Sequence, residues 1–256
     1  MAQAGPPING ASAKGVLGRL SKRALDSLLP PQCLGCSALV EESGTLCSVC
    51  WGEITFLGPP QCHVCGLPFE YDLGEGALCG ACVRRAPVYR RARAALAYDP
   101  ASRGLVIAFK HADRTDAAPA YGRWLARAGS GLIAESDLIA HVPLHWTRLF
   151  TRRYNQAALL AQALGRQSGL PVAPDLLVRR RRTPSQGGLS PYRRRRNVSG
   201  AFAVRPKRQL EGLGVLLVDD VFTTGATVAA CCRALLKAGA GSVDVLTLAR
   251  VQRPVP

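Results

Sequence analysis

The stretch that decides the fold is VLLVDDVFTTGAT, residues 215–227. Its apolar residues 215–218 predict a buried strand, and two carboxylates, Asp219 and Asp220, follow them. A turn rich in threonine and glycine then opens a helical pattern. In open α/β sheets, ligands bind at the carboxyl ends of strands, and a helix N-terminus there attracts anions. The stretch therefore predicts an α/β fold with a sugar-phosphate site at this strand end.

The two parts of this stretch suit different ends of a sugar phosphate. The candidate catalytic residues Asp219 and Asp220 can accept hydrogen bonds from ribose hydroxyls, directly or through a hydrated Mg²⁺. Backbone amides and threonine hydroxyls after them can donate to a monoester phosphate at the positive end of the helix. The candidate phosphate-binding residues are Thr223, Thr224, Gly225, Ala226 and Thr227. A structural Asp-Asp turn with a capping threonine is the alternative.

Strand and helix patterns alternate around this stretch, which is typical of an α/β domain with a mostly parallel sheet and flanking helices. The predicted strands cover 94–98, 138–144, 213–218 and 242–249. The predicted helices cover 102–109, 119–134, 155–168, which Asn155 can cap, and 226–238, which Gly239 closes. In residues 179–200 the apolar residues follow neither the period of a helix nor that of a strand.

A second candidate segment begins after the strand predicted over 138–144. In a parallel sheet it would lie at the same edge as Asp219, where its backbone amides can meet a pyrophosphate. The candidate residues of this loop are Leu144, His145, Arg148 and Arg153. Alternatively, the arginines are charged residues of a solvent-exposed loop without a ligand. His145 has no neighbour in sequence with which it could form a catalytic dyad.

Residues 179–196 hold eight arginines and no acid. Such a segment cannot bury itself. It can close as a mobile loop over a polyphosphate, or it can grip the backbone of a nucleic acid. The candidate residues are Arg182, Thr183, Gln186, Arg193, Arg194, Arg195 and Arg196. A merely solvated run of charge is the alternative.

Eight of the ten cysteines form four Cys-x-x-Cys pairs. The pairs are Cys33/Cys36, Cys47/Cys50, Cys62/Cys65 and Cys79/Cys82. The first 30 residues show no signal-peptide core and no apolar run could span a bilayer, so we expect a cytoplasmic chain with thiolates that bind two structural Zn²⁺ ions. Short loop closure favours two sites formed from sequential pairs. An interleaved arrangement is the alternative. Cys231 and Cys232 lie in a helical pattern and are expected in the core.

Charge is distributed unevenly along the 256 residues. The net charge is +16, yet residues 1–82 carry four basic and seven acidic side chains. The rest of the chain is therefore strongly basic and suited to polyanions such as nucleic acid or nucleotides. Genomic bias toward arginine is the alternative explanation.

Residues 215–227 resemble the phosphoribosyl pyrophosphate (PRPP) motif of type I phosphoribosyltransferases. Three further segments and the cysteine pairs extend the likeness to 33–250, where the chain is similar to the ComF family of competence proteins. Those proteins join a double zinc ribbon to such a domain. The three segments are FKHAD at 109–113, VPLHWTRLFTRRYNQAALLAQAL at 142–164 and RRTPSQGGLSPYRRRRNVSGAF at 181–202.

Composition and apolar spacing predict a disordered tail and a short amphipathic helix over 1–29, and the resemblance implies a double zinc ribbon (30–85) followed by a phosphoribosyltransferase-like domain (86–256). It also implies a cytoplasmic protein that handles incoming single-stranded DNA in natural transformation, with PRPP and Mg²⁺ as ligands and a DNA-uptake helicase as a partner. The resemblance does not decide whether the PRPP site catalyses a reaction. The alternative is a phosphoribosyltransferase of nucleotide salvage acting on a free base, which would need a hood that reads the base.

Overall fold

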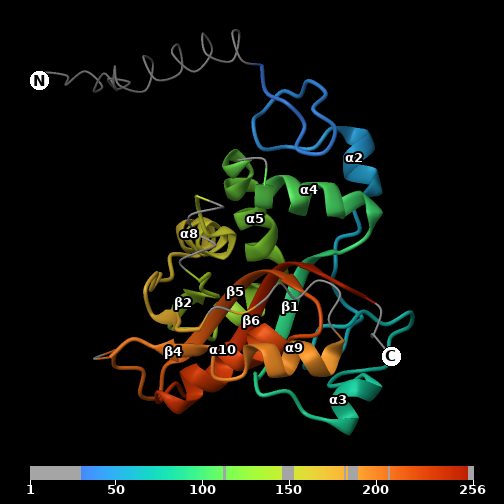
Figure 1. Ribbon diagram of the computed structural model, residues 1–256. Coiled ribbons are helices and arrows are strands. Elements are labelled where there is room, and N and C mark those ends of the chain that lie inside the picture. The colour runs from blue at the N-terminus through green and yellow to red at the C-terminus, as the bar shows by residue number, and fades with distance from the viewer. Residues whose placement is uncertain are drawn as a thin grey trace, which may run out of the picture.

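The computed structural model describes residues 30–111, 114–145, 153–181, 183, 190–206 and 208–252. The tail and helix predicted over 1–29 lie outside these residues. The centre is a four-stranded sheet in the order β1-β6-β5-β2, and all its neighbouring strands are parallel (Figure 1). The strands are β1 (Ala92–Ala97), β2 (Leu138–His141), β5 (Gly214–Phe222) and β6 (Ser242–Arg250).

The sheet separates two apolar cores. Along β5, Leu216 and Val218 face one core, while Val215 and Leu217 face the other. A strand buried on both faces reads as a continuous apolar run, which is why the sequence identifies β5 so clearly. The strand continues to Phe222, four residues beyond the predicted end at Val218, but residues 219–221 are only partly buried.

Three long helices cover one face of the sheet: α4 (Pro100–His111), α5 (Ala118–Ala128) and α8 (Gln156–Ser168) (Figure 1). Asn155 caps α8 as expected, because its side chain accepts a hydrogen bond from the Ala157 amide at 3.0 Å. The helix predicted over 119–134 is divided at Gly129 into α5 and the short α6 (Ser130–Ile133), after the 3-10 helix η1 (Thr115–Ala117). None of the described helices is long and apolar enough to cross a membrane.

The other face carries α10 (Ala226–Lys237) and an antiparallel hairpin of β3 (Leu177–Arg179) and β4 (Phe202–Val204). Between these two strands lies α9 (Pro191–Val198), within the residues 179–200 whose sequence shows neither the helical nor the strand period. The helix begins with a capping serine, Ser190, and a proline in its first turn. These signals start a helix without apolar periodicity, which explains why the periodicity did not reveal it.

The two zinc ribbons pack on opposite faces of the sheet. The first contains α2 (Ser48–Glu53) and places Leu34 and Ile54 in the core below α4 and α5. The second ends with α3 (Gly80–Arg84), and its cysteines join the core on the side of α10. Figure 1 shows α2 beside α4 and α3 on the side of α9.

The linker between the ribbons protects the edge of the sheet. Backbone hydrogen bonds join Leu57 to Ala95 and Ala97 to Thr55, each at 2.9 Å. These bonds cover part of β1, which is the edge strand on that side. An edge strand without cover would expose unpaired backbone groups to other chains.

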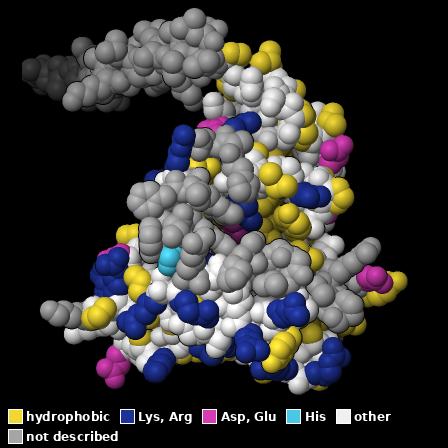
Figure 2. Space-filling model, in the orientation of Figure 1, with side chains coloured by type: hydrophobic (Ala, Val, Ile, Leu, Met, Phe, Trp, Pro, Cys, Tyr) yellow, Lys and Arg dark blue, Asp and Glu magenta, His cyan; other side chains and the backbone are white. Residues whose placement is uncertain are grey.

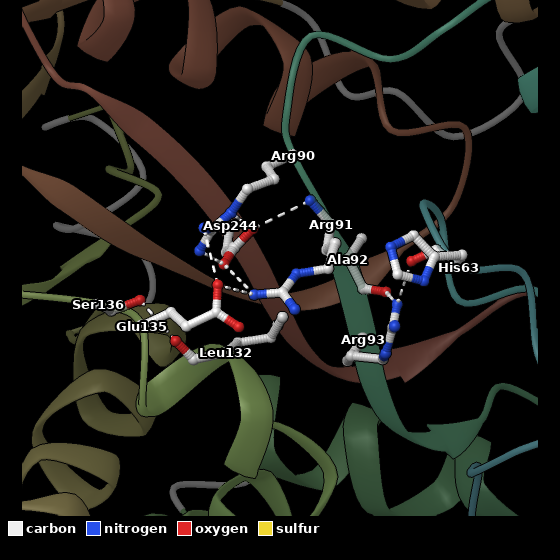
Figure 3. Close-up of polar contacts among 9 residues, drawn as sticks. All are labelled: His63, Arg90, Arg91, Ala92, Arg93, Leu132, Glu135, Ser136 and Asp244. Carbon is white, nitrogen blue, oxygen red and sulfur yellow. Dashed lines mark hydrogen bonds and ion pairs between the residues drawn. The ribbon is translucent and has the colours of Figure 1, made fainter. Parts of the chain in front are cut away.

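A buried ionic cluster joins the second ribbon to the sheet. Asp244 of β6 is 1% exposed and lies between Arg90 and Arg91, which precede β1 (Figure 3). The Arg90 Nε donates to Asp244 at 3.1 Å and the Arg91 amide donates at 3.0 Å. Both guanidiniums also contact Glu135 at 2.8 Å. The cluster lies at the end of the sheet opposite to Asp219.

Candidate functional site

The eight cysteines of the Cys-x-x-Cys pairs form two clusters. Within each cluster the four Sγ atoms all lie within 4.8 Å of one another, and the clusters are Cys33/Cys36/Cys47/Cys50 and Cys62/Cys65/Cys79/Cys82. Two of the sulfur separations are 3.7 Å and 3.6 Å. A tetrahedral zinc ion with Zn–S bonds of about 2.3 Å has sulfur atoms about 3.8 Å apart. The clusters therefore fit two structural zinc ions formed from sequential pairs, and the interleaved arrangement is not observed.

Backbone amides around each cluster favour the thiolate that binds a metal. The Cys47 amide donates to Cys33 Sγ at 3.2 Å, and the Cys79 amide donates to Cys62 Sγ at 3.3 Å. Burial raises the pKa of the Cys62 thiol, but hydrogen bonds from nearby backbone amides outweigh it and lower the pKa to about 7. The second cluster is buried in all four residues, whereas Cys36 of the first is exposed.

A cavity of about 290 Å³ opens at the carboxyl ends of β5 and β2. Seven of the candidate residues line it, namely Leu144, Asp219, Asp220, Thr223, Gly225, Ala226 and Thr227. The parallel pairing of β2 with β5, with His141 opposite Val218, brings the segment after β2 to this edge. The register thus explains why residues far apart in sequence meet here.

The two aspartates lie within β5 rather than after it. The Asp220 amide donates to Asp219 Oδ1 at 2.9 Å, and Lys110 Nζ lies 3.0 Å from Asp220 Oδ2. Burial, and then the charge of Asp220, raises the pKa of the Asp219 carboxyl well above its usual range, while Lys110 and Arg179 oppose that rise. Negative charge at this edge is therefore only partly balanced by the protein, which suits a site for a cation or a hydroxyl donor.

The turn after β5 forms an anion cradle. Gly225 has φ of 70°, and a Cβ atom there would lie 2.8 Å from Phe222 Cζ, so the close approach and the left-handed backbone both call for glycine. α10 begins at the next residue, and the first amides of a helix have no partner within it. Thr224 does not line the cavity, but it lies between the lining residues Thr223 and Gly225, and its Oγ1 is buried without a hydrogen-bond partner among the described residues. A phosphate oxygen would satisfy these donors.

The segment after β2 contributes fewer residues to the cavity wall than the sequence predicted. Leu144 lines the cavity, whereas His145 is buried and Arg153 is exposed, and neither is among the lining residues. Arg148 lies outside the described part of the chain. The segment is held at its two ends by Asn155, whose Nδ2 donates to the Val142 carbonyl at 3.1 Å while its Oδ1 caps α8.

His141, at the end of β2, is a structural histidine. Burial lowers the pKa of its imidazole. Its Nδ1 accepts from Asn155 Nδ2 at 3.2 Å, which leaves Nε2 to donate to the Pro174 carbonyl at 2.7 Å. The neutral ring therefore joins β2 to the chain that leads into β3.

Sequence reasoning did not select several residues of the cavity wall. Lys110 is the most informative, because it pairs with Asp220 and its carbonyl accepts from Gln156 Nε2 at 3.1 Å. The FKHAD segment contains it, so a signal was present. Arg179 also lines the cavity, and its guanidinium lies 5.2 Å from the Phe202 ring centroid. Its only signal was its place at the start of the arginine run.

The structure describes part of the arginine-rich segment. Thr183 is buried and accepts a hydrogen bond from Arg179. Arg193 and Arg196 are exposed on α9. Figure 2 shows basic side chains spread over the face formed by α9, α10 and the hairpin. Arg182 and Gln186, and the side chains of Arg194 and Arg195, lie outside what the structure describes.

Comparisons with known proteins agree with the two parts of this chain. Residues 24–84 match the double zinc ribbon domain, and residues 155–254 match the phosphoribosyl transferase domain. DNA utilization protein YhgH of Escherichia coli (strain K12) is 35% identical over 80% of this chain and 90% of its own length. Competence protein F of Haemophilus influenzae is 32% identical with the same coverage. Competence protein ComFC of Bacillus subtilis (strain 168) is 25% identical over 83% of this chain and 87% of its own.

Proposed function

Because this chain belongs to the ComF/YhgH family of double zinc ribbon proteins with a phosphoribosyltransferase domain, we propose that it handles single-stranded DNA in the cytoplasm and binds PRPP with Mg²⁺ in its cavity. The names of the relatives, DNA utilization protein and competence protein, support the nucleic-acid half of the proposal. The cavity chemistry supports the PRPP half.

One observation carries the proposal: the basic helix α9 is attached to the cavity wall through one hairpin. Arg179, the last residue of β3, lines the cavity. Two residues later, Arg181 donates to the carbonyls of Asn197 and Ser199 at the end of α9, each at 3.0 Å. The same hairpin therefore serves the cavity and the basic surface, so the two ligands would be bound close to each other.

The exposed arginines of α9 are suited to a phosphate backbone. No carboxylate pairs with Arg193 or Arg196 in the described part of the chain. Arginine side chains that neutralise phosphates release counterions, which makes binding depend on salt but not on base sequence. We therefore propose that α9 binds the phosphates of the DNA backbone and does not recognise bases.

The cavity would hold PRPP through complementary charges. Asp219 and Asp220 would accept from the ribose hydroxyls and hold Mg²⁺, and the amides and hydroxyls of 223–227 would donate to the 5-phosphate. Bound Mg²⁺ would neutralise pyrophosphate charge, while Lys110 and Arg179 add positive charge at the same wall. In a transfer reaction this preorganised charge would stabilise the departing pyrophosphate.

The DNA half is tested with a charge-matched pair of variants. One variant is Arg193→Gln with Arg196→Gln; the control is Arg123→Gln with Arg127→Gln, two exposed residues of α5. Fluorescence anisotropy with a labelled oligonucleotide should show weaker binding for the α9 variant and a salt dependence flatter by about 0.7 for each phosphate that is no longer neutralised. The α5 control should keep the wild-type slope. If the salt dependence of binding has the same slope for the wild type and both variants, α9 does not bind the DNA backbone.

Salvage activity is tested by incubating the purified protein with PRPP, Mg²⁺ and a panel of free bases, and by following pyrophosphate release. We expect no rapid release with any single base. Rapid release with one base would replace the DNA-handling proposal with a phosphoribosyltransferase of nucleotide salvage.

A further inference from the structure

Arg250, the last residue of β6, lies against the second cysteine cluster. Its guanidinium is buried and donates to the Cys65 carbonyl, and its Nη2 lies 3.6 Å from Cys65 Sγ. A positive charge beside a sulfur atom stabilises the thiolate form that binds a metal. Arg250 thus contacts both the backbone and the ligand atom of one zinc-binding residue.

The same guanidinium supports an aromatic ring beside the cavity. It lies 4.8 Å from the centroid of Phe222, the residue opposite Arg250 in the β5·β6 register. Tyr89, in the linker after the second ribbon, packs edge-on against this ring with centroids 6.1 Å apart. Phe222 is therefore held between Arg250, which contacts the second ribbon, and Tyr89, which follows that ribbon in the chain.

Phe222 in turn supports the anion cradle. Its ring lies under Gly225, where even a Cβ atom would come within 2.8 Å of Cζ. The ring also lines the cavity. A shift of Phe222 toward or away from the cradle would therefore move the backbone amides that start α10. Tightly packed contacts transmit such shifts because protein interiors contain few voids.

The first cluster has a different setting. Cys36 is exposed, and two buried apolar residues of its ribbon, Leu34 and Ile54, pack in the core on the opposite face of the sheet. The Phe222 ring and the second cluster share the other core. The two metal sites are therefore unequal in their connection to the cavity.

We propose that Arg250 is a positioning residue that couples the metal state of the second cysteine cluster to the phosphate-binding turn over 223–227. With metal bound, Cys65 fixes Arg250, Arg250 fixes the Phe222 ring, and the ring supports Gly225. Loss of metal releases the Cys65 backbone and with it the cradle. The ligand in this proposal, PRPP, rests on the proposed function.

Hydrogen exchange tests the coupling without any ligand. Amides 223–228 are compared in the full-length wild type, Arg250→Met and Arg93→Met, with zinc content measured for each. Arg93 is the matched control, because it donates to the His63 carbonyl near the same cluster at 3.1 Å but lies on β1. We expect exchange to rise about tenfold in Arg250→Met and to stay at the wild-type rate in Arg93→Met. Equal rates in both variants would overturn the coupling.

A second set of variants shows whether increased exchange in Arg250→Met comes from misfolding. Arg250→Lys keeps the charge and should restore most of the protection in a folded protein. Cys65→Ser should lose one of two zinc ions and raise exchange over 223–228 as Arg250→Met does. Loss of the zinc ion with unchanged exchange there would also overturn the proposal.

Calorimetry with PRPP and Mg²⁺ separates this inference from the proposed function. If the wild type binds PRPP, Arg250→Met should weaken binding about tenfold and Arg250→Lys less. Wild-type affinity in Arg250→Met would contradict the coupling. Absence of PRPP binding by the wild type would overturn the proposed ligand, while the exchange comparison would still decide the coupling.

Discussion

The two ends of the parallel sheet both carry buried or half-buried acids, but their surroundings differ. At the amino end, Asp244 contacts two arginines and the Arg91 amide (Figure 3). At the carboxyl end, Asp219 and Asp220 lie side by side with Lys110 as the ion-pair partner of Asp220. At the amino end two arginines balance two acids, Asp244 and the half-exposed Glu135, whereas at the carboxyl end one lysine contacts a pair of acids.

This difference separates a structural site from a binding site. A buried carboxylate that is fully paired holds elements together and has no capacity left for a ligand. In a pair of carboxylates that is only partly neutralised, the charge of one disfavours the charge of its buried neighbour, so the pair gains from a cation or a hydroxyl donor. The imbalance therefore marks the carboxyl end, with its cavity, as the functional end.

The largest effect is a loss of stability, expected at the amino end of the sheet, where the arginines balance the acids. Asp244→Asn leaves Arg90 and Arg91 with the half-exposed Glu135 as their remaining acidic partner, and should lower the free energy of unfolding by about 3 kcal/mol, the low end of the range for a buried pair. Urea denaturation measures this loss. Asp175→Asn is the control, because Asp175 also pairs with an arginine, Arg208, but at the surface, where such a pair contributes little. Equal losses in the two variants would contradict a structural role for the buried cluster.

An intermediate effect is expected at the cradle. Thr224→Val keeps the shape of a side chain whose hydroxyl has no partner within the described structure. PRPP affinity should fall by about 1.5–3 kcal/mol, which is tenfold or more, because one hydrogen bond to a charged group is lost. The free energy of unfolding without ligand should not fall. Thr45→Val, in the first ribbon, should bind PRPP as the wild type does; a loss of stability without loss of affinity in Thr224→Val would place the phosphate elsewhere.

The smallest effect is a change in pH dependence. Burial and the neighbouring Asp220 raise the pKa of Asp219 above its value in the unfolded chain. Between these two pKa values the folded state keeps a proton that the unfolded state releases, so stability falls as pH rises from about 4 to about 8. The stability of Asp219→Asn relative to wild type should therefore increase with pH in ligand-free protein. Parallel pH profiles in urea denaturation would show that the acid pair is already balanced.

The sequence predicts the functional end better than the structural end. Residues 215–227 place a strand, two acids and an anion cradle within a short stretch, so local order alone reveals the site. The partners of Asp244 lie up to 154 positions earlier in the chain. A single acid in an apolar strand carries no sign of such partners, and the cluster therefore could not be predicted.

The same distinction applies to the hairpin and to Lys110. β3 and β4 are each three residues long, too short for a strand period to be recognised. α9 depends on its cap, Ser190, rather than on apolar spacing. The contact of Lys110 with Asp220 depends on how α4 ends beside β5. Features marked by a clear apolar period or by a compact motif were predicted, whereas short strands, a helix marked only by its cap, and contacts made by packing were not.

The most direct test pairs a binding and a stability measurement on one variant, Asp219→Asn with Asp220→Asn. Calorimetric titration with PRPP and Mg²⁺ and thermal unfolding are run on the same samples of variant and wild type. We predict that the variant loses PRPP binding while its melting temperature is equal to or higher than that of the wild type, because two poorly balanced charges are removed. Wild-type affinity in a folded variant, or a large fall in melting temperature, would contradict the assignment of the carboxyl end as the binding end.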